Sequence, residues 1–281
     1  YGNYENRGKA RSRYMQETLG GPEAYAKAFR EKLAEVEASG ENLDLTVESP
    51  TVSKEGDGVV VDGPRVIAQK QPGLYAVAWH PIGGQVDKQA FCDLSAALAQ
   101  IPGTELRLSP DQTVYIINLN GEEAQRVLAL TADGARNAFE CSVSCIGGKT
   151  CQVGVRDSQG LLHACVEAVR SAGVPDGALP QMYISGCMSS CGTHQTGVIG
   201  LRGASKLVDG KPQSAFALFV HGESRQGGET MGRELGTILE NRVPEFLVEL
   251  GKTVAASGVS FADWNAQNPD GLEEIAAPYL A

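Results

Sequence analysis

The sequence predicts an α+β protein in which a small βαββα module precedes a larger region of alternating strands and helices. Two observations support this fold class. Over residues 73–132, strand-like and helix-like segments follow one another in the order βαββα. Over residues 133–281, apolar strands and helices alternate with loops rich in glycine and serine. The chain of 281 residues is long enough to bury a core in each part, and residues 1–72 are expected to form a helical linker and connector.

Residues 1–72 contain one clear helical pattern. From Gly20 to Ser39, apolar residues recur at helical spacing with charged residues between them, and Pro22 suits the first turn of a helix. Residues 46–72 are rich in valine, glycine and aspartate, which predicts short strands joined by tight turns. A basic run lies upstream, and we interpret it as a solvated stretch or a local contact. It comprises Arg7, Lys9, Arg11 and Arg13.

The module over residues 73–132 is predicted element by element. Its strands are expected at 74–80, near 104–108 and at 112–118, and its helices at 87–100 and 121–131. Apolar residues at helical spacing define the inner face of each helix. These are Phe91, Leu94 and Leu98 in the first helix and Val127, Leu128 and Leu130 in the second.

The larger region, over residues 133–281, is predicted to contain a helix with a continuous apolar stripe. Asp157 or Ser158 is a suitable N-cap for this helix. The stripe consists of Leu161, Leu162, Cys165, Val166 and Val169. The other expected elements are a strand at 182–185, a buried strand at 214–221, helices at 229–241 and 244–255, and a packed tail with Phe261 and Trp264.

Composition and charge argue against two classes of partner. Hydrophobic residues make up 42% and charged residues 21% of the chain, which is ordinary for a globular protein. No apolar run approaches the length of a membrane span and no signal-peptide pattern opens the sequence, so we expect a cytoplasmic protein that does not contact a membrane. A net charge of -10 repels phosphate backbones and argues against nucleic acid as a partner.

Two tight cysteine pairs point to a metal site. Cys145 and Cys151 have C-x5-C spacing, and Cys187 and Cys191 have C-x3-C spacing. Four thiolates in loops of small residues are a suitable ligand set for one 4Fe-4S cluster, because such loops let the backbone approach the inorganic core. Structural zinc sites favour shorter loops within each pair, and buried free thiols are the remaining alternative. The odd total of seven cysteines argues against a disulfide framework.

Other cysteines and one histidine have more than one interpretation. Cys141 also has C-x3-C spacing to Cys145 and could replace it as a ligand, but the paired glycines after Cys145 favour Cys145 itself. Cys92 and Cys165 lie in apolar helical patterns and are expected in the core. His194, just after the second cysteine pair, could donate a proton to a bound oxyanion, although a structural hydrogen bond is the favoured interpretation.

Two further motifs accompany the cysteine pattern, namely Leu106-Arg-Leu-Ser-Pro-Asp-Gln112 in the βαββα module and Gly197-Val-Ile-Gly-Leu-Arg-Gly203 after the second pair. Together, over residues 73–281, these features resemble the second half of the sirohaem-containing nitrite and sulfite reductases. The segment from Asn6 to Tyr14 is similar to the link between the two pseudo-repeats of that family. The resemblance implies a ferredoxin-like half-module at 73–132, followed by an α/β domain at 133–281 that binds a 4Fe-4S cluster and sirohaem.

The resemblance also implies roles for individual residues. By position, the cluster ligands would be Cys145, Cys151, Cys187 and Cys191. The last of these would also bridge to the sirohaem iron. Arg107 and Gln112 match family positions and are expected to bind the cofactor. Because sirohaem carries many carboxylates, nearby cationic and amide side chains are further candidates, and these are Asn118, Asn120, Arg136, Lys149, Gln195 and Arg202.

The reaction that the resemblance implies is a six-electron reduction of nitrite to ammonia or of sulfite to sulfide. A ferredoxin or similar protein is the expected electron donor, and the substrate is a small oxyanion. In this family the substrate-binding arginines and lysines come mostly from the first pseudo-repeat, in cis or in trans, so no catalytic residue is assigned in this chain. The alternatives are a non-catalytic half that carries a cluster for electron transfer, and a sirohaem-free relative that acts on another tetrapyrrole.

Overall fold

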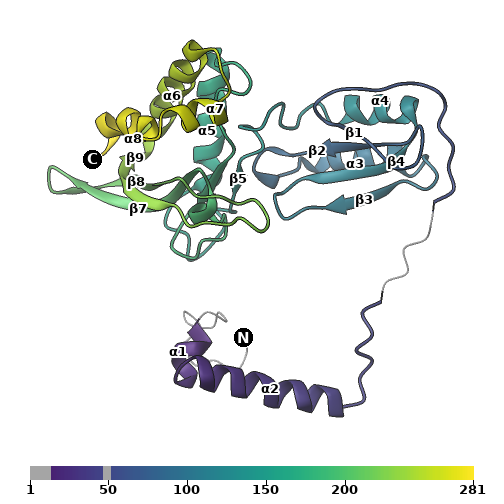
Figure 1. The fold of residues 1–281 in the computed structure, drawn as a ribbon, viewed down its shortest axis with the longest axis horizontal. Coiled ribbons are helices and arrows are strands. Elements are labelled where there is room, and N and C mark those ends of the chain that lie inside the picture. Colours follow the sequence, from purple (N-terminus) through teal and green to yellow (C-terminus); the bar gives the residue numbers. More distant parts are fainter. Residues whose placement is uncertain (1–13, 47–51) are drawn as a thin grey trace. The chain divides into compact units, whose positions relative to one another are not determined.

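The computed structural model describes residues 14–46 and 52–281, which fall in two units divided between residues 51 and 52 (Figure 1). The first unit contains helices α1 (Met15–Leu19) and α2 (Pro22–Ala38). Helix α2 confirms the helix predicted between Gly20 and Ser39, with Pro22 in its first turn. The basic run at 7–13 and, apart from Tyr14, the segment similar to the family's link lie outside the described residues. Within the described ranges, no helix has both the length and the apolar character needed to cross a bilayer.

The second unit begins with a four-stranded antiparallel sheet in the order β1-β2-β4-β3. Its elements are β1 (Val66–Ala68), β2 (Tyr75–Trp79), the 3-10 turn η3 (Ile82–Gly84), α3 (Lys88–Leu98), β3 (Glu105–Leu108), β4 (Val114–Leu119) and α4 (Gly121–Leu130). The order from β2 to α4 confirms the predicted βαββα module, and β1 adds an edge strand beside β2. Asp87 and Asn120 cap the amino ends of the two longer helices with their side chains.

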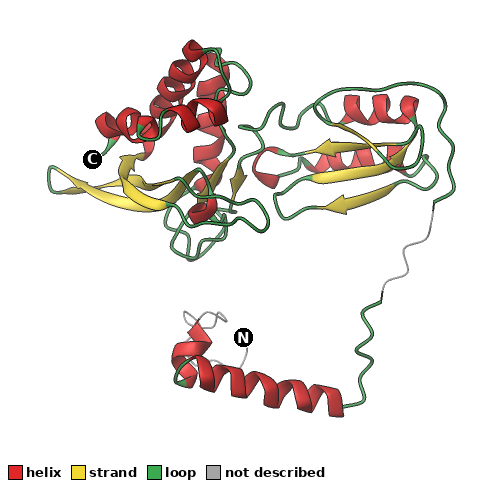
Figure 2. Ribbon diagram, in the orientation of Figure 1, coloured by secondary structure: helices red, strands yellow, loops and turns green. Residues whose placement is uncertain are grey.

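The core of this module is formed by residues of its sheet and of its two longer helices, and Figure 2 shows the arrangement of these elements. Two predictions for α3 were wrong, because Phe91 is 45% exposed and Cys92 is also exposed. Cys92 lies two residues from the buried Leu94, and residues two apart on a helix point to nearly opposite sides. Leu130, at the end of α4, is likewise exposed. The fully buried residues of this core include Val77, Trp79, Leu94, Ile116, Leu119 and Val127.

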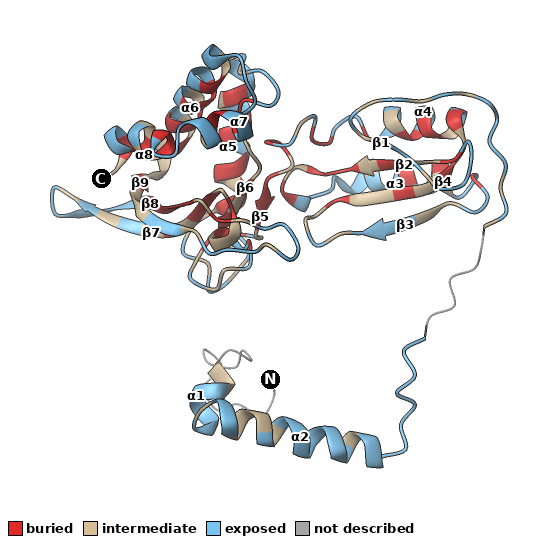
Figure 3. Ribbon diagram, viewed as in Figure 1, coloured by how far each residue is buried: buried red, intermediate tan, exposed pale blue. Residues whose placement is uncertain are grey.

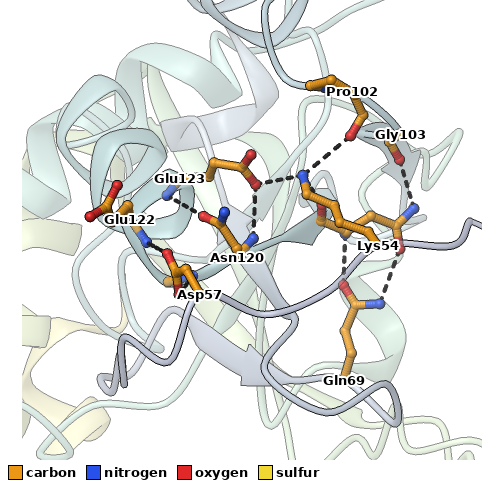
Figure 4. Close-up of polar contacts among 10 residues, drawn as sticks. Lys54, Asp57, Gln69, Pro102, Gly103, Asn120, Glu122 and Glu123 are labelled. Carbon is orange, nitrogen blue, oxygen red and sulfur yellow. Dashed lines mark hydrogen bonds and ion pairs between the residues drawn. The ribbon is translucent and has the colours of Figure 1, made fainter.

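Polar side chains hold the segment before β1 against the module (Figure 4). Lys54, whose side chain is 14% exposed, donates to the carbonyl groups of Pro102 and Asn118 and pairs with Glu123 at 2.5 Å. Asp57 accepts hydrogen bonds from the first backbone N–H groups of α4, which a helix cannot satisfy internally. The described part of the expected connector therefore packs on the module, and the domain boundaries expected after residues 72 and 132 stay a prediction.

The remainder of the second unit forms a five-stranded mixed sheet in the order β5-β6-β7-β8-β9. The strands are β5 (Val143–Ser144), β6 (Met182–Ser185), β7 (Ile199–Val208), β8 (Lys211–Val220) and β9 (Arg233–Leu239). The first three strands are parallel, whereas β7, β8 and β9 are antiparallel. The helical elements are α5 (Ser158–Ser171), η4 (His194–Thr196), η5 (Glu240–Arg242), α6 (Val243–Ser257), α7 (Phe261–Gln267), α8 (Gly271–Ala276) and η6 (Ala277–Tyr279).

Helices α5 to α8 pack on this sheet around one hydrophobic core (Figure 3). The apolar stripe predicted for α5 is buried throughout, including Cys165 at 0% exposure. Asp157 is the N-cap, since its side chain accepts a hydrogen bond from the Gly160 N–H. The structure also confirms the predicted β6, the buried strand within β8 and helix α6. Phe261 and Trp264 are buried, as expected for a packed tail.

The structure overturns one predicted helix. Residues 229–241 were expected to be helical but contain strand β9, which pairs with β8 from Ala215–Leu239 to Val220–Arg233. Glycine disfavours the helix interior, and Gly232 and Gly236 both fall in this segment. Pairing with the buried strand β8 also gives the backbone N–H and C=O groups of β9 their partners. Tertiary pairing therefore overrides the apolar spacing that suggested a helix.

Candidate cofactor site

The two cysteine pairs lie in loops at one edge of the five-stranded sheet. Cys145 directly follows β5, and Cys187 follows β6 by two residues. These strands are parallel neighbours, with Ser144 opposite Ile184. The carboxyl ends of adjacent parallel strands meet at the same edge of a sheet, where α/β folds commonly bind ligands. The fold thus brings together two loops that are far apart in the sequence.

Backbone hydrogen bonds join the two cysteine loops. The carbonyl oxygen of Gly186 accepts from the N–H groups of Val155 at 3.0 Å and Arg156 at 2.9 Å. This close approach requires glycine, because a Cβ on Gly186 would lie 2.7 Å from the Arg156 carbonyl oxygen. The first loop also forms a hydrogen bond within itself, since the Gly148 N–H donates to the Arg156 carbonyl oxygen at 2.8 Å. The small residues of both loops therefore serve close backbone packing.

A backbone N–H group and a hydroxyl group lie against the Cys145 sulfur. The backbone nitrogen of Gly186 lies 3.1 Å from Sγ, and the hydroxyl oxygen of Ser158 lies 3.2 Å from it. Ser158 is fully buried and is the first residue of α5, so the positive amino end of that helix dipole lies beside the sulfur. Groups in these positions can hydrogen-bond a cysteine sulfur that serves as a metal ligand.

The donor set fits an iron–sulfur cluster by its chemistry. All seven cysteines lie among the described residues, and none forms a disulfide. Cys151 and Cys187 are half-buried, Cys191 is exposed, and the Ser189 N–H is directed at Cys187 Sγ from 3.5 Å. Thiols on two joined loops, with backbone N–H groups facing sulfur, match the needs of such a cluster. Over 14–46 and 52–281, no three His, Cys, Asp or Glu side chains already converge as metal ligands, so the four-cysteine assignment stays a prediction.

Of the two residues at matching family positions, one lies beside the cysteines. Gln112, at a positive φ of 71°, reaches β5, where its Nε2 donates to the Ser144 carbonyl at 2.8 Å and its Oε1 accepts from the Ser144 N–H at 3.2 Å. The side chain acts as an additional partner for the short strand that leads into Cys145. Arg107 is exposed on β3 and pairs with Glu105 at 2.5 Å. Cofactor binding by Arg107 and Gln112 stays a prediction.

The candidates chosen for proximity in sequence divide into two groups. Lys149, Gln195 and Arg202 belong to the cysteine loops or to the strand beside them. Arg202 pairs with Glu234 at 3.1 Å, and its guanidinium carbon lies 5.1 Å from the centre of the Phe219 ring. The others have contacts that serve the fold, namely Asn118 to the Gly103 carbonyl, Asn120 as the cap of α4, and Arg136 through its backbone N–H to Glu140.

His194 is buried beneath the second cysteine loop. Its side chain is 1% exposed and packs edge-on against Phe219, with 4.7 Å between ring centroids. Burial, together with the positive charge of Arg202, lowers the pKa of His194 to about 4. The imidazole is therefore neutral near pH 7. This supports a structural part for His194 over proton donation to a substrate.

Cys141 lies at the opposite edge of the sheet from the cysteine loops. It precedes β5 and lines a cleft of about 360 Å³ together with His80, Asp111 and Gln181. Burial and the nearby carboxylates of Asp111 and Glu140 raise the pKa of Cys141 to about 11. Because the thiolate rather than the thiol binds metal, these surroundings favour Cys145 over Cys141 as a ligand.

Two buried residues at the start of α5 were missed by sequence reasoning as parts of this site. Gln159 donates from Nε2 to the carbonyl oxygens of Gly83, Ser144 and Cys145 at 2.8, 3.2 and 3.1 Å. Ser158 was considered only as a helix cap, yet its hydroxyl contacts the Cys145 sulfur. The available signal was that a capped helix begins soon after a cysteine loop, because helix amino ends favour negative charge. Spacing alone does not show which side chains of the first turn face that loop.

No family model matches the sequence. The chain is similar to ferredoxin–nitrite reductases from plants and a cyanobacterium. The chloroplastic protein of Zea mays is 31% identical over 167 residues, which cover 55% of this chain and 28% of that protein. The chloroplastic protein of Betula pendula is 27% identical over 248 residues, 85% of this chain and 40% of that protein. The protein of Synechococcus elongatus is 28% identical over 164 residues, 55% of this chain and 31% of that protein. The matched segments thus cover less than half the length of each of these relatives.

One solved structure shares the fold over nearly the whole chain. The NirA protein of Mycobacterium tuberculosis matches with a TM-score of 0.60 over 93% of this chain and 48% of that chain, at 20% sequence identity. A likeness at this level of identity concerns the fold. It confirms the predicted α+β class, in which a small antiparallel sheet with its helices precedes a mixed sheet with its own helices.

Proposed function

Because the chain belongs to the nitrite and sulfite reductase family, we propose that it is the half of such a reductase that holds a 4Fe-4S cluster and sirohaem. The observation that carries this proposal is the position of both cysteine pairs in hydrogen-bonded loops at the carboxyl ends of β5 and β6. The proposed reaction is the six-electron reduction of nitrite to ammonia or of sulfite to sulfide.

The chain's own part would be to hold the cofactors and to order their surroundings. The proposed cluster ligands are Cys145, Cys151, Cys187 and Cys191. Cys191, the exposed member of the set, would also bind the sirohaem iron. When bound, the two cofactors supply electron transfer and an iron centre for an oxyanion. Gly186 and Ser158 would place their N–H and O–H groups against the Cys145 sulfur.

Positive charge for the sirohaem carboxylates would come from arginines near the cysteine loops. Arg156 and Arg202 lie beside Gly186 and Ser185, and each has a buried Nε atom without a hydrogen-bond partner among the described residues. A buried donor of this kind is costly unless an acceptor binds it, which supports a carboxylate ligand there. Arg107 and Gln112 are proposed to contact the same cofactor from the βαββα module.

The remaining parts of the enzyme are proposed to come from a first pseudo-repeat, in cis or in trans. The chain covers 28% of the maize relative and 40% of the birch relative. Most of the substrate-binding cations would lie in that first repeat, so the catalytic residues of this half stay unassigned. A ferredoxin or similar protein is the proposed donor, since the relatives are named for ferredoxin, and the proposed compartment is the cytoplasm.

A second candidate function is electron transfer without turnover. In that case the chain would carry a cluster and would need a partner to supply the first repeat. The reductase and the electron-transfer half both require the cysteine loops. They differ in whether a substrate anion binds to the iron of a tetrapyrrole held by this chain.

The test is to measure iron, acid-labile sulfide and the visible spectrum of anaerobically purified protein. The reductase proposal predicts a Soret band and a red-region band in addition to broad cluster absorption, and both bands should change when nitrite or sulfite is added. Cluster absorption alone would support the electron-transfer half. Wild-type protein that contains neither iron nor sulfide would contradict both functions.

A matched pair of cysteine variants separates ligands from core thiols. Cys191→Ser should lose cluster and sirohaem together, because one sulfur is proposed to bind both. Cys165→Ser changes a fully buried thiol in α5 and should keep both cofactors. Equal cofactor content in the two variants would contradict the proposed part of Cys191.

A further inference from the structure

We propose that Ser158 is a positioning residue that acts through Cys145, raising the reduction potential of the cluster by a hydrogen bond to the cysteine sulfur. The inference rests on the proposed function, because it needs Cys145 to be a cluster ligand. It also goes further, since a serine outside both cysteine pairs then helps to set how readily the chain accepts an electron.

The Ser158 hydroxyl has a fixed place beside the sulfur. Its oxygen lies 3.2 Å from Cys145 Sγ and 2.8 Å from the Cys145 carbonyl oxygen, and the residue is fully buried. Ser158 opens α5, whose amino end is capped by Asp157 through a hydrogen bond from the Gly160 N–H. The first turn of the helix therefore positions the hydroxyl.

The single hydroxyl proton has two possible acceptors, the sulfur and the carbonyl oxygen of Cys145, and the carbonyl oxygen has two other donors. The Cys145 carbonyl oxygen also accepts from Gln159 Nε2 at 3.1 Å and from Ser144 Oγ at 3.2 Å. A cluster-bound sulfur carries negative charge, and hydrogen bonds to charged acceptors are stronger than those between neutral groups. The Ser158 hydroxyl is therefore expected to donate to Sγ once Cys145 is a thiolate ligand.

A second donor meets the same sulfur from another element. The Gly186 N–H lies 3.1 Å from Cys145 Sγ, and the Gly186 carbonyl is itself held by Val155 and Arg156. Donors to a ligand sulfur stabilise the reduced, more negative form of the centre and so raise its potential. A backbone N–H cannot be removed by changing the side chain, whereas the hydroxyl can, so Ser158 offers the direct test.

The experiment is an EPR-monitored redox titration of the cluster in the anaerobically purified full chain and in its Ser158→Ala variant. We expect a lower midpoint potential in S158A, with iron and acid-labile sulfide per chain unchanged. Ser142→Ala is the matched control, because Ser142 is equally buried next to β5 but its hydroxyl bonds Phe139 and Met182 instead of a cysteine. The midpoint potential of S142A should equal that of the wild type.

A second pair of variants applies if S158A does not retain a cluster. Ser158→Thr and Ser158→Val have the same shape and differ in the hydroxyl, so the potential should be near the wild-type value with threonine and lower with valine. Equal potentials with and without the hydroxyl, at full cluster content, would overturn the inference and leave the proposed function standing. Wild-type protein without iron and sulfide would overturn the proposed function and the inference with it.

Discussion

Cys141 and Cys145 flank the same two-residue strand, β5, yet their surroundings differ in charge and in hydrogen bonding. Cys141, at the amino edge of the sheet, lies near the carboxylates of Asp111 and Glu140, which together with burial raise its pKa to about 11. Cys145, at the carboxyl edge, has an N–H and an O–H group against its sulfur. Spacing alone does not distinguish the two thiols, because both fit a C-x3-C or C-x5-C pair. On the proposed assignment, the edge of the sheet at which a thiol emerges decides which one is a ligand.

The largest expected difference between the two edges is in cluster content, which should be either full or absent. Cys145→Ser should lose the cluster, because it removes a proposed ligand, whereas Cys141→Ser should keep it. The measurement is iron and acid-labile sulfide per chain after anaerobic purification, with circular dichroism to verify that both variants fold. Retention of a full cluster in C145S, or its loss in C141S, would reverse the assignment of the two edges.

Residues at the amino edge of the five-stranded sheet are expected to affect the free energy of unfolding and not the cluster content. Glu140 is 3% exposed, and its carboxylate accepts from Arg170 Nε at 2.7 Å and from the Arg136 N–H at 2.8 Å. Glu140→Ala leaves these donors without an acceptor, so the free energy of unfolding should fall by about 3 kcal/mol. Urea titration of the cofactor-free chain measures this change.

The control for that variant lies near the carboxyl edge. Glu234→Ala removes the partner of Arg202, but Glu234 is 46% exposed and the pair is screened by solvent, so its loss should cost less than about 1 kcal/mol. If both variants lowered the free energy of unfolding equally, burial would not distinguish the two ion pairs.

The third expected effect concerns acid stability under the second cysteine loop. The folded-state pKa of His194 is lowered to about 4 from 6.5, so below pH 6.5 the unfolded chain binds a proton that the folded chain does not. Stability should therefore be lost as the pH falls from about 6.5 toward 4. Between pH 7 and pH 5 the loss due to this residue should be about 2 kcal/mol.

Two histidine variants isolate that contribution. His194→Gln should remove this part of the pH dependence in urea titrations of the cofactor-free chain, whereas His163→Gln, at an exposed position of α5, should not. The carboxylates that also titrate in acid are common to both variants and cancel in the difference. An unchanged pH dependence in H194Q would contradict the burial of a neutral imidazole.

Segments with strong local patterns were predictable from the sequence. The apolar stripe predicted for α5 is buried in the structure, and β6 occupies the residues predicted for it. The same kind of pattern failed for β9, because pairing with β8 decided its conformation. Cys165 and Cys92 both lie in helices with apolar patterns, yet Cys165 is buried and Cys92 is exposed. The difference depends on which side of each helix faces the core, and the local pattern did not settle this.

The contacts of the cysteine site were less predictable. Spacing and composition indicated the chemistry of four thiols, but the approach of Gly186 to Cys145 depends on β5 and β6 becoming parallel neighbours. The two hydrogen bonds between the Gln112 side chain and the Ser144 backbone likewise connect the four-stranded part of the chain to β5. No local sequence pattern specifies that these two segments meet. Pairing between segments that are far apart in the sequence cannot be predicted from the local spacing of apolar residues.

The loop with the second cysteine pair is also the connection between two parallel strands. It leaves β6 at Ser185 and enters its neighbour β7 at Ile199, with only the short turn η4 between them, where such crossovers usually contain a helix. Both of its ends are therefore fixed by the sheet. A one-residue shift of β7 would turn the buried Leu201 to the other face, so a gain or loss of residues here has to be taken up within the loop. Any such change in length would fall in the segment that carries the second cysteine pair.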